Sequence, residues 1–126
     1  MLRWVHLAAV SAFATLFLSA CASTPISYGG PTQLEDVEIG IEGVLKEFGR
    51  VIAVEGVATN RGEGDFDRIE VVFELLDENG IKVGDAAAEA NGLRAGQTWR
   101  FDAFATVKYR AEVRRVRVDR VELSRG

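Results

Sequence analysis

Alternating apolar and polar positions run through most of the chain and predict β-strands. Residues 34 to 42 alternate first, and residues 66 to 77 show the most regular pattern. A period of two residues places successive side chains on opposite faces of a strand, so one face is expected to be buried. The expected core face comprises Val37, Ile39 and Ile41 in the first stretch and Ile69, Val71, Phe73 and Leu75 in the second.

Four further stretches carry a strand signal: residues 50 to 60, 81 to 90, 98 to 105 and 107 to 123. The first is rich in β-branched residues, and Gly56 within it predicts a bulge or a close backbone approach. Trp99 and Phe101 alternate with Phe104, so we expect the first two in the core and Phe104 on the outer face. The pattern of the last stretch slips twice, which predicts β-bulges or a division into two strands.

Turn-forming residues separate these stretches. Residues 43 to 49 predict a turn with Phe48 docked on the domain, because two glycines bracket too few residues for a stable helix. Asp77 and Gly80 predict a tight hairpin turn, in which the aspartate accepts backbone hydrogen bonds and the glycine is left-handed. About seven short strands at even spacing, with no convincing helix, predict an all-β antiparallel sandwich.

A family resemblance rests on the most regular strand. The segment Phe73-Glu74-Leu75-Leu76-Asp77 resembles the Phe-x-Leu-Tyr-Asp signature of the FxLYD domain, a small immunoglobulin-like sandwich of bacterial envelope lipoproteins. Two further segments are similar to the family's neighbouring strands, Val54-x-Gly56-x-Ala58-x-Asn60 and Leu93-x-x-Gly96 followed by Phe101. The resemblance covers residues 36 to 123.

The resemblance implies structural roles and no catalytic residue or cofactor. The residues to which it assigns packing or turn chemistry are Phe73, Leu75, Asp77 and Gly80. Leu76 stands where the family has tyrosine, at a position that we expect to face outward.

The first twenty residues predict a lipoprotein signal peptide. Residues 7 to 18 are apolar apart from Ser11 and Thr15, and this run is shorter than the roughly 20 residues of a membrane-spanning helix. The tetrapeptide Leu18-Ser19-Ala20-Cys21 resembles the bacterial lipobox, at which residues 1 to 20 are removed and Cys21 is lipidated. An uncleaved membrane anchor with a buried cysteine is the alternative.

This processing divides the chain into three parts. Residues 1 to 20 would be the signal peptide, residues 21 to 33 the lipidated cysteine and a flexible tether, and residues 34 to 126 the sandwich. The tether is expected because its residues are small, polar and turn-forming. Ala22, in place of the aspartate that retains similar lipoproteins at the inner membrane, favours the outer membrane, with the domain facing the periplasm.

Composition limits the chemistry of the mature chain. It would carry 14 basic and 19 acidic residues, a net side-chain charge of −5, which disfavours binding to nucleic acid. The single histidine, His6, would leave with the signal peptide, and the single cysteine, Cys21, would be lipidated. The commonest general base, the commonest zinc ligands and a thiol nucleophile are then missing, so we expect a non-enzymatic protein without cofactors.

Carboxylates could still carry chemistry. A pair of acids suffices for glycoside hydrolysis, but most acids here alternate with apolar residues, as on a solvated sheet face. Glu63, Asp65 and Asp67 could ligate Ca²⁺, although their spacing fits no complete EF-hand loop. An ordinary solvated turn is the favoured interpretation.

Charge is distributed unevenly along the chain. The first strand is acidic (Glu35, Asp36, Glu38, Glu42), and the last run is basic (Lys108, Arg110, Arg114, Arg115, Arg117, Arg120). Immunoglobulin-like sandwiches often place the first and last strands side by side, which would pair these charges across strands. The other interpretation is a basic stripe for an anionic envelope partner, contacted by Arg114, Arg115 and Arg117.

Together these features predict a lipid-anchored, non-enzymatic envelope protein. Its sandwich would be a protein-binding or accessory module for another envelope protein. The alternative is a binding module for an anionic envelope lipid or glycan.

Overall fold

Seven antiparallel β-strands form the part of the chain that the computed structural model describes, residues 25 to 125. The strands are β1 (Thr32–Leu34), β2 (Val37–Glu47), β3 (Arg50–Asn60), β4 (Arg68–Leu76), β5 (Lys82–Ala90), β6 (Thr98–Val107) and β7 (Arg115–Ser124). This part contains no helix long and apolar enough to cross a membrane. The predicted signal peptide and Cys21 lie outside the described residues. The predicted all-β antiparallel fold of about seven strands is confirmed.

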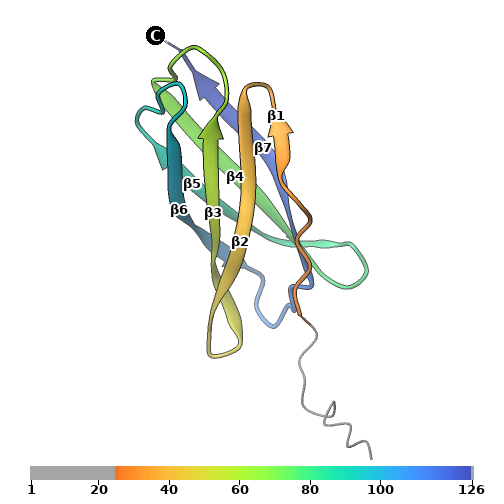
Figure 1. Ribbon diagram of the computed structural model, residues 1–126. Coiled ribbons are helices and arrows are strands. Elements are labelled where there is room, and N and C mark those ends of the chain that lie inside the picture. The colour runs from red at the N-terminus through yellow and green to blue at the C-terminus, as the bar shows by residue number, and fades with distance from the viewer. Residues whose placement is uncertain (1–24, 126) are drawn as a thin grey trace, which may run out of the picture.

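The strands form one continuous sheet that folds into an immunoglobulin-like sandwich of two layers (Figure 1). Its order is β1-β2-β3-β6-β5-β4-β7, so β1, β2, β3 and β6 make one layer and β5, β4 and β7 the other. The layers join where residues 84 to 87 of β5 pair with β6. Gly84 permits this corner, because a Cβ there would lie 2.4 Å from the carbonyl oxygen of Thr106.

The segment before β1 closes the opposite side of the sandwich. The backbone N–H of Ser27 donates to the carbonyl of Arg114, and the N–H of Val116 donates to the carbonyl of Ser27, each at 2.9 Å. Ile26 and Tyr28 pack against the core. Residues 25 to 33 therefore lie along the domain, and their assignment to a flexible tether is wrong. Two apolar side chains among turn formers are enough to hold this segment.

The core lies between the layers. The predicted core face of β4, Ile69, Val71, Phe73 and Leu75, is fully buried, as expected. The ring of Phe73 lies 6.0 Å from that of Phe101 on the facing layer, and Trp99 stacks at 4.6 Å on Phe101. Phe101 also explains Gly56, its partner across β3 and β6: a Cβ at Gly56 would lie 2.6 Å from the phenylalanine ring. The close approach predicted at Gly56 is made mainly by this ring, and the carbonyl oxygen of Gly40 would also lie 3.1 Å from the added Cβ.

Two apolar side chains lie where the sequence pattern did not place them. Leu76, expected to face outward, is only 3% exposed. It stands between Lys82 and Arg115 on the adjacent strands, whose aliphatic stems can cover it. Phe48, expected to dock on the domain, is 95% exposed. β2 and β3 stay paired as far as Glu47 and Arg50, which carries the turn beyond the core.

The last stretch of the sequence contains one strand and one bulge. Phe73 pairs with Val118 and Val72 pairs with Arg120, so Asp119 is an extra residue in β7. This bulge confirms one predicted slip of the pattern. Residues 108 to 114 form the β6–β7 loop, which accounts for the rest of the irregularity.

Candidate functional site

The residues that carry the family resemblance have structural roles in the described domain. Phe73 and Leu75 are fully buried in the core. The carboxylate of Asp77 accepts hydrogen bonds from the backbone N–H groups of Asn79 and Ile81, both at 2.9 Å. Gly80 has a φ of 78°, as the turn requires. These four residues shape the fold, so a functional surface must be sought elsewhere.

The glycine-rich turn between β3 and β4 is organised by Asn60. Its side-chain amide donates to the carbonyls of Gly64 at 2.8 Å and Leu93 at 3.1 Å, and its side-chain oxygen accepts from the N–H of Gly62 at 3.0 Å. Asn60 is fully buried and the one buried polar residue of the described part. This network joins the β3–β4 turn to the β5–β6 turn, which together we call the apex, residues 61 to 67 and 91 to 97.

One of the three acidic residues of that turn, Asp65, is engaged by the backbone of the protein itself. The carboxylate of Asp65 accepts the backbone N–H of Ala95 at 2.9 Å, across the apex. Within residues 25 to 125, no group of three or more His, Cys, Asp and Glu side chains is placed to hold a metal ion. The candidate calcium ligands Glu63, Asp65 and Asp67 are therefore not brought together.

The acidic first strand and the basic last strand are not neighbours. β2 pairs with β1 and β3, whereas β7 pairs with β4 at the other edge of the sheet. The expected pairing between these strands is wrong for Glu38 and Glu42, which find cations on nearer elements. Asp36, just before β2, does pair with Arg125, just after β7, at 3.0 Å. Glu38 pairs with Arg61 at 3.3 Å and Glu42 pairs with Arg100 at 2.8 Å.

The three arginines predicted to contact an anionic partner do not form a free row. Arg114 pairs with Glu112 at 2.7 Å, and Arg117 pairs with Glu74 of β4. Arg115 is exposed and makes no salt bridge with any residue of the described part. Two of these charges are thus compensated within the domain.

An apolar row crosses the outer face of the sheet instead. Leu45, Ala53, Phe104 and Ala87 are directly opposite one another on β2, β3, β6 and β5. Opposite residues of an antiparallel sheet project from the same face. Phe104 is 77% exposed, and Ala53 is buried in the row although it lies outside the core cluster. With the neighbouring, partly exposed Ile52, these residues form what we call the outer apolar row.

Two acids stand directly beside the outer apolar row. Glu55 of β3 and Asp102 of β6 are cross-strand partners, two residues along their strands from Ala53 and Phe104 and on the same face. Like charges placed directly opposite each other destabilise a sheet. Neither carboxylate forms a salt bridge with a described residue. No described cation pairs with either acid to relieve this repulsion, which marks the face as a candidate binding surface.

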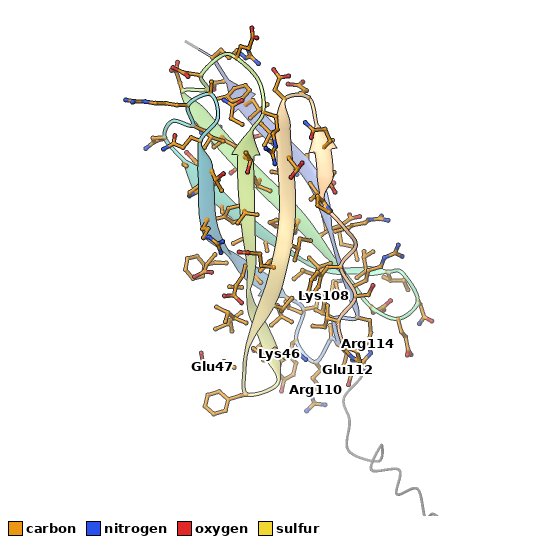
Figure 2. All side chains as sticks on the ribbon, viewed as in Figure 1. Lys46, Glu47, Lys108, Arg110, Glu112 and Arg114 are labelled. Atoms are coloured by element: carbon orange, nitrogen blue, oxygen red, sulfur yellow. The ribbon has the colours of Figure 1, made fainter. Side chains whose placement is uncertain are left out.

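A second exposed surface lies at the end of the sandwich opposite the apex. We call it the base, and it comprises the tip of the β2–β3 hairpin, residues 46 to 50, and residues 108 to 115 after β6 (Figure 2). An opening of about 480 Å³ separates the two loops, and its walls include Ile26, Gly49 and Ala111. The base therefore surrounds the point at which the described chain enters the domain.

Ion pairs shift the pKa values of three groups on the layer of β4 and β5. A bidentate hydrogen bond from Arg68, at 2.8 and 3.0 Å, lowers the pKa of Glu89 and raises that of Arg68. A hydrogen bond to Asp85 raises the pKa of Lys82. All these groups keep their usual charges at neutral pH, so they serve as ion pairs across and along the sheet.

The sequence alone predicts part of the outer apolar row. Its alternation already placed Phe104 on the outer face, which is the signal for the outer apolar row. The row itself depends on the strand order, which joins residues far apart in the chain. Searches against protein-family models, curated proteins and solved structures find no match to this chain. The resemblance to the FxLYD domain accordingly stays a prediction.

Proposed function

We propose that the protein is a lipid-anchored, non-enzymatic envelope component whose sandwich binds another envelope protein. Cys21, in its lipobox-like setting, would carry the lipid, and the domain would face the periplasm from the outer membrane. The observation that carries the binding role is the outer apolar row with its uncompensated acidic pair.

The row has the properties of an interface. An aromatic side chain in the middle of a strand, standing beside other apolar side chains, fits the apolar centre of a protein contact. Charged residues border it, including the ion pair of Arg100 with Glu42. Glu55 and Asp102 favour a partner with an apolar patch next to a lysine or arginine, because such a cation would relieve their repulsion.

Site-specific photo-crosslinking in living cells tests the binding role. A photoreactive residue in place of Phe104 should give one discrete crosslinked protein. The matched control is the same residue in place of Arg120, an exposed position on the outer face of β7. Identical products at both positions, or none at position 104, would contradict the proposal.

The anchor is tested separately. Mass spectrometry of the protein purified from membranes should find an acylated Cys21 at its N-terminus, and Cys21→Ser should release the protein into the soluble fraction. Two or three acyl chains are needed for stable anchoring, since one chain binds membranes only marginally. An unmodified cysteine in a protein of full length would exclude the anchor.

A further inference from the structure

The hairpin at the base exposes an aromatic residue in a costly conformation. Phe48 has a φ of 51° and is followed by Gly49 at 77°. A two-residue turn with both φ values positive favours asparagine, aspartate or glycine at its first position. Phenylalanine there carries backbone strain, and at 95% exposure it gains almost no packing in return. Neither turn formation nor core packing explains this side chain.

The second loop of the base, residues 108 to 115, also combines an exposed aromatic side chain with a positive φ. Tyr109 is 78% exposed, and the next residue, Arg110, has a φ of 65°. The guanidinium carbon of Arg110 lies 5.2 Å from the centre of the tyrosine ring. Two loops that are separate in the sequence thus present one aromatic side chain each at the same end of the molecule.

Uncompensated positive charge gathers at the same end. Six cations of the described part make no salt bridge, and all but Arg94 lie at the base: Lys46, Arg50, Lys108, Arg110 and Arg115. With Arg114, Glu47 and Glu112 included, the base carries a net charge of +4. Asp77 and Glu78 of the adjoining β4–β5 turn lower the net charge of this end to +2, whereas the mature chain as a whole is at −5. Figure 2 shows Lys46, Lys108, Arg110 and Arg114 together at this end.

The chain enters the domain beside these groups. Pro25 and Ser27 line a surface hollow together with two cations, Arg114 and Arg115, and two acids, Asp77 and Glu78. Figure 1 shows the described chain beginning at the end that holds the base. Three residues lie between Cys21 and Pro25, and the four Cα-to-Cα steps that join the two span at most about 14 Å. A lipid on Cys21 would therefore hold the base within that distance of the bilayer.

We propose that the base docks on the surface of an anionic bilayer. Phe48 and Tyr109 would enter the headgroup region, where aromatic side chains are favoured, and the five free cations would meet lipid phosphates. This inference rests on the proposed lipid anchor, and it adds an orientation: the apex points away from the membrane. A bilayer fits better than a folded partner, because the short reach from Cys21 leaves little room beneath the base.

Spin labels on the full, lipidated protein in vesicles test the docking. Because Cys21 would be blocked by lipid, Glu47→Cys provides a single reactive thiol at the hairpin tip, and Glu63→Cys provides the matched position at the apex. In vesicles that contain phosphatidylglycerol, the label at position 47 should be immobilised and shielded from a water-soluble relaxation agent. The label at position 63 should stay accessible, and both should be accessible in vesicles of phosphatidylcholine alone.

Charge variants test whether the cations of the base contribute to the docking. Each cation removed near an anionic surface weakens docking about fivefold, so K46Q with K108Q should shift the docked population by roughly 25-fold. Arg94→Gln removes the unpaired cation of the apex and should change nothing. Equal shielding of position 47 in the double variant would overturn the proposal.

Flotation separates this inference from the anchor on which it rests. A protein that floats with anionic vesicles while its label at position 47 stays accessible is anchored but not docked, which refutes the docking alone. A protein that does not float and has an unmodified Cys21 refutes both. The crosslink at position 104 reports on protein binding independently of either result.

Discussion

At the scale of single residues, Asn60 is the side chain on which the apex depends. It is buried without charge, and each of its polar side-chain atoms bonds to the backbone of a turn. A buried polar group is tolerated because its hydrogen bonds are complete, so the same burial makes the loss of any partner costly.

Replacing Asn60 with alanine should therefore destabilise the domain by about 2 to 4 kcal/mol. The carbonyl of Gly64 and the N–H of Gly62 would lose their partner, and the carbonyl of Leu93 would keep only the N–H of Phe66. Chemical denaturation measures the change in the free energy of unfolding. Asn79→Ala is the matched control, because Asn79 is exposed in the β4–β5 turn and its loss should cost less than about 0.5 kcal/mol. Equal effects of the two variants would show that the buried network contributes nothing.

At the scale of strands, sequence periodicity predicts what each strand does by itself. β3 occupies residues 50 to 60 as predicted, and β4 buries its predicted face, because alternation reports directly on one buried side. Periodicity carries no information on which strands pair. The prediction that the first and last strands lie side by side was therefore wrong. It also missed the extension of β2 to Glu47, since residues past the core need no alternation. The burial of Leu76 was not predicted, because the side chains that cover it belong to other strands.

The ion pair between β4 and β5 gives the sheet a pH dependence whose sign follows from Glu89. Its pKa is lowered in the folded state by the hydrogen bond from Arg68, so the pair stabilises the fold above the unfolded-state pKa of about 4.3. This contribution is lost as the pH falls through the lower, folded-state pKa. Glu89→Gln should therefore lower the melting temperature at neutral pH and leave it unchanged in strong acid. Glu78→Gln, in the exposed β4–β5 turn, should have little effect at either pH, and a Glu89→Gln effect that persisted in acid would contradict this origin.

At the scale of the whole molecule, charge is divided between the two ends of the sandwich. The base together with Asp77 and Glu78 of the adjoining turn carries a net charge of +2, whereas the apex together with residues 35, 36 and 125 carries five acids and three cations, a net charge of −2. A domain with this polarity orients itself at an anionic surface before any contact forms. The proposed docking therefore bears on the proposed protein contact. A domain held in one orientation also holds the outer apolar row at one distance from the membrane.

Phe104 is directly opposite Ala53, which lies five residues from Phe48 at the hairpin tip. At 3.3 Å per residue, Phe104 is therefore roughly 16 Å from that tip. A partner that binds there must itself lie close to the membrane. A stiff insertion of ten prolines between Cys21 and Pro25 would add about 30 Å, and it should abolish both docking and the crosslink from position 104. A Gly-Ser insertion of the same length lets the domain return to the bilayer and should preserve the crosslink. A crosslink that survived the stiff spacer would mean that the partner reaches the row from the periplasm and that the distance to the membrane is irrelevant to it.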